Sequence, residues 1–189
     1  MLSVIIATLD SERALVPTLS ALVPGAVAGL VTEVLVADGG SRDETAAVAE
    51  IAGCNFLVAE GSLGRRLRAA AAATRAPWLV FLRPGTILDT SWTAEIGTFL
   101  EHSAWSVQAA AFRRGTPAQS GLREAVSLLA GALGAKPRPE QGLIISRQLY
   151  EQIGGHAEHA SAPEADLIRR VGRRRLTRLS TRAFHAGSP

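Results

Sequence analysis

Short runs of apolar residues alternate with helical stretches along the first half of the chain. The clearest runs lie at residues 3–7, 33–37 and 78–82, and a weaker one lies at 55–59. Runs of this length, bounded by polar residues, are typical of strands buried on both faces. Because the strands alternate with helices, the sequence predicts an α/β fold in which a mostly parallel sheet carries helices on both faces.

The stretches between the strands carry the start and stop signals of helices. A helix is expected from residue 12 to about 23, a second over 43–52, and an alanine-rich third over 63–75 that Pro77 ends. Beyond residue 90 the pattern loosens. There we expect helices near 93–102, 122–133, 147–153 and 163–171, and strands near 105–112 and 141–145.

Nothing in the sequence divides the chain into separate domains. It has 189 residues and no internal repeat or low-complexity linker, so residues 1–189 are expected to form one domain with halves at 1–90 and 91–189. A hydrophobic fraction of 47% with 20% charged residues excludes general disorder. Cys54 is the single cysteine, which excludes an internal disulfide and a multi-thiolate metal site and favours a reduced, cytoplasmic protein.

The charge pattern bears on possible partners. The net charge is +3, Lys136 is the only lysine, and seven arginines cluster within residues 169–182. No nucleic-acid-binding motif accompanies them and aromatics make up only 5%, so we expect no nucleic-acid partner. Residues 14–32 are uncharged, but prolines and glycines interrupt them, which predicts a half-buried helix and a loop rather than a membrane span. The start of the chain lacks the basic segment of a signal peptide.

The most informative motif is VADGGSRDET at residues 36–45. It places Asp38 at the end of a predicted buried strand, before two glycines and the acidic start of a helix. Ligands bind beyond the carboxyl ends of parallel strands, where an acid can accept hydrogen bonds from a ribose or a base. The same residues also fit an Asp-Gly turn with Ser41 as a helix cap. The glycine fingerprints of dinucleotide folds and P-loops are absent.

Several segments resemble the family 2 nucleotide-sugar glycosyltransferases, and among them the small bacterial family 2-like transferases. The segments are SVIIATLDSE at 3–12, EVLVADGGSRDET at 33–45, GSLGRRLRAAAAATRAPWLVFLRPGT at 61–86, PEQGLIISRQLYEQIGG at 139–155 and PEADLIRRVGRRRL at 163–176. The resemblance implies a GT-A, Rossmann-like fold: a three-layer α/β/α sandwich with a mostly parallel mixed sheet. It makes residues 1–90 the nucleotide-binding half and residues 91–189 the acceptor-side half.

The resemblance also implies a nucleotide-sugar site in the first half. Asp38 matches the acid that contacts the uracil or ribose of the donor, and Thr8 and Asp10 match the loop beside the base. Arg65 matches the arginine at the start of the alanine-rich helix, where its guanidinium could reach the nucleotide or diphosphate. A solvated arginine at the helix terminus is the alternative for Arg65.

Acceptor-side roles follow in the second half. Glu164 is similar to the catalytic base that removes the proton of the acceptor hydroxyl. Asp166 is the alternative base, but two residues of separation place the acids about 200° apart on a helix, so they cannot share one cleft. Glu140 and Gln141 match the acceptor side, with a turn at the entry of a strand as their alternative role.

The chain departs from the family at residues 83–86. The family carries a D-x-D-like stretch there whose last Asp holds Mg²⁺ or Mn²⁺ on the diphosphate, whereas this chain reads Arg83-Pro84-Gly85-Thr86. Three explanations stay open. Arg83 replaces the ion as a fixed cation, Asp89 supplies a displaced metal ligand, or the site binds without catalysis.

The implied activity is transfer of a sugar from a nucleotide diphosphate sugar to a hydroxyl acceptor, with inversion. The alternative is a non-enzymatic nucleotide or nucleotide-sugar binding protein or partner subunit. A nucleotidyltransferase is disfavoured because its chemistry depends on paired carboxylates for metal. The basic cluster and the helix at 122–133 leave open a peripheral contact with the inner face of a membrane that carries a lipid-linked acceptor. Homo-oligomerisation is also left open.

Overall fold

The computed structural model describes residues 1–102, 108–115 and 138–185. Its strands are β1 (Leu2–Thr8), β2 (Val31–Asp38), β3 (Asn55–Val58), β4 (Trp78–Leu82), β5 (Thr86–Leu88), β6 (Ala109–Arg114), β7 (Leu143–Ser146) and β8 (Leu176–His185). The helices are α1 (Glu12–Val27), α2 (Thr45–Ile51), α3 (Leu63–Ala73), α4 (Trp92–His102), α6 (Arg147–Gln152) and α7 (Pro163–Val171), with short 3₁₀ turns η1 (Pro139–Gln141) and η2 (Arg173–Arg175).

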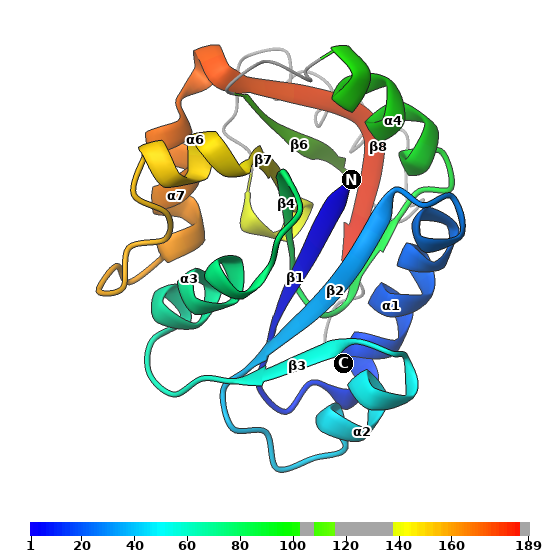
Figure 1. Ribbon diagram of the computed structural model, residues 1–189, viewed down its shortest axis with the longest axis vertical. Helices are drawn as coiled ribbons and strands as arrows, with labels where there is room; N and C mark the ends of the chain where they lie inside the picture. The colour runs from blue at the N-terminus through cyan, green and yellow to red at the C-terminus, as the bar shows by residue number, and fades with distance from the viewer. Residues whose placement is uncertain (103–107, 116–137, 186–189) are drawn as a thin grey trace, which may run out of the picture.

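The strands form one mixed sheet in the order β3-β2-β1-β4-β7-β6-β8-β5 (Figure 1). The pairs β1–β2, β1–β4, β2–β3 and β6–β8 are parallel, and β4–β7, β6–β7 and β5–β8 are antiparallel. The predicted mostly parallel mixed sheet is therefore confirmed. Thr8 pairs with Asp38, and Ile6 pairs with Leu82, so β1, β2 and β4 end at the same edge.

Helices cover both faces of the sheet, as Figure 1 shows. Alternate residues of one strand enter different cores: Val4 and Ile6 of β1 pack with α1, α2 and α4, whereas Ile5 packs with α3, α6 and α7. This alternation explains why β1 is mostly apolar: every residue from Leu2 to Ile6 is buried, and Ser3 is the one polar residue among them. The three-layer α/β/α arrangement is thus confirmed. No helix in the described residues is both long and apolar enough for a membrane span.

The expected end of the first helix near residue 23 is wrong, because α1 continues to Val27. Pro24 and Gly25 weaken an isolated helix, but here Gly25 packs against α4. A Cβ on Gly25 would lie 2.2 Å from the Trp92 ring, and Trp92 Nε1 donates to the Ala21 carbonyl at 3.0 Å. Tertiary packing therefore outweighs local propensity at this position.

The strands β5 and β8 are additions that the sequence did not predict. In β8 the side chains of Leu179, Thr181 and Ala183 are buried at alternate positions, as a strand requires. Arg178 and Arg182 lie next to these residues and obscured the pattern, because the segment resembled a charged surface run. The expected helix at 122–133 lies outside the described residues, and β6 begins at Ala109 rather than near residue 105.

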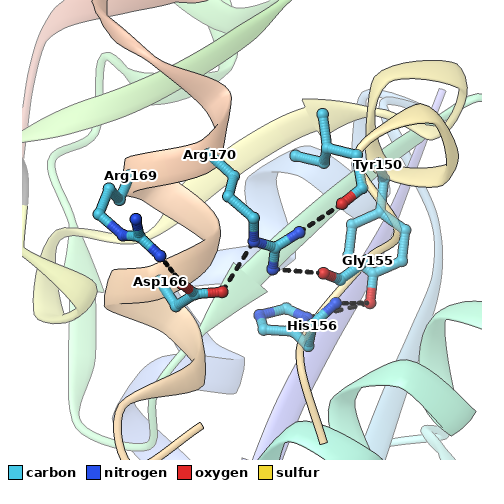
Figure 2. A network of polar contacts seen from close by, with 7 residues as sticks. Tyr150, Gly155, His156, Asp166, Arg169 and Arg170 are labelled. Atoms are coloured by element: carbon cyan, nitrogen blue, oxygen red, sulfur yellow. Dashed lines mark hydrogen bonds and ion pairs between the residues drawn. The ribbon is translucent and has the colours of Figure 1, made fainter.

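A network of polar contacts fixes α7 against the turn that follows α6 (Figure 2). Arg170 donates through Nε to Asp166 at 2.7 Å and through Nη2 to the Gly155 carbonyl at 2.6 Å, and it also donates to the Ile153 carbonyl. Asp166 accepts a second bond, from Arg169 on the following turn of α7 (Figure 2). Arg170 thereby satisfies backbone carbonyls that the end of α6 leaves without helical partners.

Next to this turn, His156 is 1% exposed and hydrogen-bonds the Tyr150 hydroxyl at 3.0 Å. Burial, together with the positive charge of Arg170, lowers the pKa of His156 to about 3. Burial likewise raises the pKa of the Tyr150 hydroxyl. Both groups are therefore neutral at pH 7, and their role is to stabilise the turn that holds α7.

The low pKa of His156 predicts acid sensitivity of the fold. In the unfolded chain His156 binds a proton as the pH falls below its ordinary pKa of about 6.5. In the folded chain it stays neutral until the pH reaches its lowered pKa of about 3. His156 should therefore lower the free energy of unfolding by roughly 2 kcal/mol between pH 7 and pH 5. Urea unfolding at both pH values measures this change. In the His156→Gln variant, the decrease in the free energy of unfolding between pH 7 and pH 5 should be smaller by about 2 kcal/mol. An equal decrease in the variant and the wild type would contradict the low pKa of His156.

Candidate functional site

The side chain of Asp38 organises the loop that follows β2. Its Oδ1 accepts from the Thr8 hydroxyl at 2.7 Å and from the Ser41 hydroxyl, and its Oδ2 accepts from the N–H groups of Gly40 and Ser41 at 2.8 and 2.7 Å. Burial acts to raise the pKa of Asp38, but these hydrogen bonds outweigh it and the pKa is lowered. The carboxylate, only 2% exposed, is thus ionised and fixed.

A second loop, after β1, is tied to the Asp38 loop. Asp10 adopts a positive φ of 47°, its N–H donates to Ser41 Oγ at 2.9 Å, and its Oδ1 accepts from the Arg42 N–H at 2.7 Å. The Glu12 N–H donates to Asp43 Oδ2 at 3.0 Å. Thr8, Asp10 and Asp38 therefore lie together at the carboxyl edge, as the sequence predicted.

Arg66, which the sequence analysis missed, reaches this edge from α3. Its Nη1 donates to the Thr8 carbonyl at 2.7 Å, and its Nε is buried without a hydrogen-bond partner among the described residues. A Cβ on Gly39 would lie 2.2 Å from Arg66 Nη1, so the first glycine of the motif makes room for the guanidinium. The predicted Arg65 is exposed, and its side chain lies beside Gly61 instead.

The helical spacing of α3 contains the signal that separates these two arginines. Leu67, Ala70 and Ala71 form the buried face of the helix. Arg66 lies one turn before Ala70 and borders this face, whereas Arg65 points to the opposite side. A helical projection of residues 63–73 therefore favours Arg66 as the arginine that approaches the sheet.

Three further predicted residues converge on the end of β4. Arg83 Nε donates to both carboxylate oxygens of Glu164 at 3.1 and 3.0 Å, and Nη2 pairs with the same carboxylate. Arg83 Nη1 lies 3.2 Å from Glu140 Oε1. The hydrogen bonds that Arg83 donates to the Glu164 carboxylate raise the pKa of Arg83, so the guanidinium stays charged. An acid of α7 is thus held against the strand end next to β1.

The two acids of α7 point in different directions, as their spacing predicted. Glu164 contacts Arg83, and Asp166 accepts hydrogen bonds from Arg169 and Arg170. The side chain of Glu164 is 14% exposed and lies at the carboxyl edge of the sheet. Asp166 holds the helix in place and does not face the strand end.

The neighbours Glu140 and Gln141 also have different surroundings. Gln141 Nε2 donates to the Phe112 carbonyl, and its Oε1 accepts from the Arg138 N–H, both at 2.7 Å. These bonds fix η1, so the strand expected from residue 141 begins at Leu143. Gln141 therefore has the alternative role of a strand-entry turn, and Glu140 alone reaches Arg83.

The described residues do not fit a divalent ion on this edge. No group of three His, Cys, Asp or Glu side chains gathers in the part of the chain that the structure describes. Asp89 accepts from the Ser91 N–H and hydroxyl at 3.1 and 3.0 Å, which fixes the turn before α4. Because β5 is antiparallel to β8, and β8 runs in the direction of β4, β5 carries Asp89 away from the carboxyl edge. The cation at the strand end is Arg83.

Comparison with protein-family models and with curated proteins gives no match. Solved structures do match. Glucosyl-3-phosphoglycerate synthase from Mycobacterium tuberculosis in complex with phosphoglyceric acid is 22% identical with a TM-score of 0.72, over 100% of this chain and 73% of that chain. Its complex with Mn²⁺, uridine diphosphate and glucosyl-3-phosphoglycerate is 20% identical with a TM-score of 0.70 and the same coverage. The chain thus has the GT-A-like α/β fold of this synthase.

Proposed function

We propose that this protein is a glycosyltransferase that uses a nucleotide diphosphate sugar and inverts the anomeric centre. The observation that carries the proposal is the contact of Arg83 with Glu164, at the same edge of the sheet as the loop of Asp38. This contact places a cation that can bind a diphosphate next to a carboxylate that can take a proton from an acceptor, at one edge of the sheet. The synthase with a similar fold has been solved in complex with uridine-diphosphate-glucose and Mn²⁺.

The nucleotide would lie against the two loops that follow β1 and β2. Thr8, Asp10 and Asp38 belong to these loops, and their mutual hydrogen bonds make the wall rigid before a ligand arrives. Asp38 has little exposed surface, so its part is to hold the Gly40 and Ser41 N–H groups in place. A prearranged wall reduces the entropy that binding costs.

The diphosphate would lie near Arg66 and Arg83. Arg66 contacts the end of β1, and Arg83 follows the neighbouring strand β4. Guanidinium groups bind phosphate oxygens in a forked geometry and stay charged at any physiological pH. Two arginines can therefore offset the negative charge of a leaving diphosphate, the part that a divalent ion plays in other enzymes.

Glu164 would act as the general base. The acceptor oxygen attacks the anomeric carbon from the side opposite the diphosphate, and its proton passes to the Glu164 carboxylate. As the new carbon–oxygen bond forms, the bond to the diphosphate oxygen breaks and the diphosphate keeps the electron pair. Attack from the opposite side inverts the anomeric configuration. Proton removal by a positioned base contributes about 10² to 10⁴ in rate.

A binding protein without catalysis is the second candidate. The observation that favours it is the engagement of both Glu164 oxygens by Arg83, which leaves the proposed base paired. The acceptor, the membrane contact and self-association stay predictions from the sequence. The helix at 122–133, on which the membrane contact depended, lies outside the described residues.

Nucleotide binding should not depend on a divalent ion. Uridine, guanosine and thymidine diphosphates are titrated calorimetrically with and without Mn²⁺. At least one should bind, with a dissociation constant that Mn²⁺ changes by less than about twofold, because Arg83 supplies the charge. A strong dependence on Mn²⁺ would contradict this charge replacement.

Arg66 should contribute more to nucleotide binding than Arg65. Arg66→Ala removes a cation at the edge of β1 and should weaken binding of the same nucleotide diphosphate by about tenfold or more. Arg65→Ala is the matched control, since its exposed side chain has the same charge, and it should change the affinity by less than about twofold. Equal losses in both variants would argue against a specific role for Arg66.

Glu164→Gln should abolish turnover while nucleotide binding is retained. Release of the nucleotide diphosphate from its sugar is measured with phosphoglyceric acid and with simple glycosides as acceptors. The rate should fall by about 10² to 10⁴, because the amide cannot accept the proton. Asp166→Asn on the same helix is the control and should retain most of the rate. An active wild type that Glu164→Gln leaves unchanged would refute the base, and an inactive wild type that binds the nucleotide would favour the binding protein.

A further inference from the structure

Every nitrogen of the Arg83 guanidinium is already engaged in the structure. Nε and Nη2 pair with Glu164, and Nη1 pairs with Glu140. A guanidinium has one planar set of five N–H donors, so it cannot present the same forked edge to a carboxylate and to a phosphate together. Nε and Nη2 form one such forked edge and Glu164 occupies it, so a phosphate that takes this fork must displace Glu164.

We propose that the donor diphosphate and Glu164 compete for Arg83, so that diphosphate binding releases Glu164 to act as the base. This inference rests on the proposed function. Without a donor, both carboxylate oxygens accept hydrogen bonds from Arg83. With the donor bound, Arg83 turns to the diphosphate and Glu164 becomes free to accept a proton.

The exposures of the three side chains indicate the direction of the exchange. Arg83 and Glu140 are 38% and 43% exposed, whereas Glu164 is 14% exposed. A phosphate can therefore reach the guanidinium from the Glu140 side and draw it from the more buried Glu164. The cluster holds two carboxylates against one guanidinium, so each acid opposes the approach of an anion.

Glu164 can stay in place when Arg83 leaves it. Its helix is fixed by the buried side chains of Leu167 and Ile168 and by the bonds of Arg170 to Asp166 and the Gly155 carbonyl. None of these contacts involves Arg83. The arginine has a long flexible stem, so the moving part of the exchange is the guanidinium.

Pyrophosphate is the probe for this exchange, because it needs no knowledge of the base or the sugar. It is titrated calorimetrically into the wild type, Glu164→Gln, Asp166→Asn and Arg83→Gln. Glu164→Gln should bind about tenfold more tightly than the wild type, since the competing carboxylate is gone. Asp166→Asn removes the same charge from the same helix without touching Arg83, and it should change the affinity by less than about twofold.

The double variant Arg83→Gln/Glu164→Gln completes the cycle. In the Arg83→Gln background the gain from Glu164→Gln should disappear, which separates competition for Arg83 from a general effect of charge. Pyrophosphate binding that Glu164→Gln leaves unchanged overturns the exchange and leaves the proposed function standing. Absence of pyrophosphate binding in every variant overturns the diphosphate site and with it the proposed function.

A measurement on the wild type tests the exchange even if one of the variants fails to fold. The Nε–H resonance of Arg83, assigned by its absence in Arg83→Lys, is followed by nuclear magnetic resonance during the same titration. It should shift on saturation with pyrophosphate, because its acceptor changes from carboxylate to phosphate. An unchanged resonance at saturation overturns the exchange.

Discussion

The parallel pairing of β1 with both β2 and β4 is the constraint on which the rest of the structure depends. It brings the ends of three strands, separated by up to 74 positions in the sequence between Thr8 and Leu82, to one edge of the sheet. The strands anchor the ends of the loops at such an edge, while the residues of the loops can vary, which suits ligand binding. Arg66 and Glu164 add groups from α3 and α7 to the same edge.

In the proposed site, side chains rather than a metal ion carry the positive charge. Arg83 carries a permanent positive charge at the strand end, and two acids neutralise it in the absence of a ligand. A paired arginine lowers the cost of keeping a charge partly out of water. In the proposed exchange, an anion that takes the fork of Arg83 competes with Glu164, so that donor binding precedes release of the base.

Local patterns fail where tertiary contacts decide the outcome. Pro24 and Gly25 predict a helix end, but the Trp92 ring packs on Gly25 and α1 continues. The arginines of β8 predict a charged surface run, yet the alternate residues between them are buried in the sheet. In both cases a long-range partner supplies the free energy that the local sequence lacks.

The sequence by itself determined the four apolar strands of the first half, the helices between them, the loop of Asp38 and the divergence of Glu164 from Asp166. Each of these depends on spacing within a few residues, which period-2 and period-3.6 patterns record directly. Helical spacing favours Arg66 over Arg65 on the sheet side of α3, but only the tertiary structure decided that Arg66 meets Thr8 and that Arg83 holds Glu164. These pairs are 58 and 81 residues apart, and no local periodicity encodes which distant side chains a folded sheet brings together.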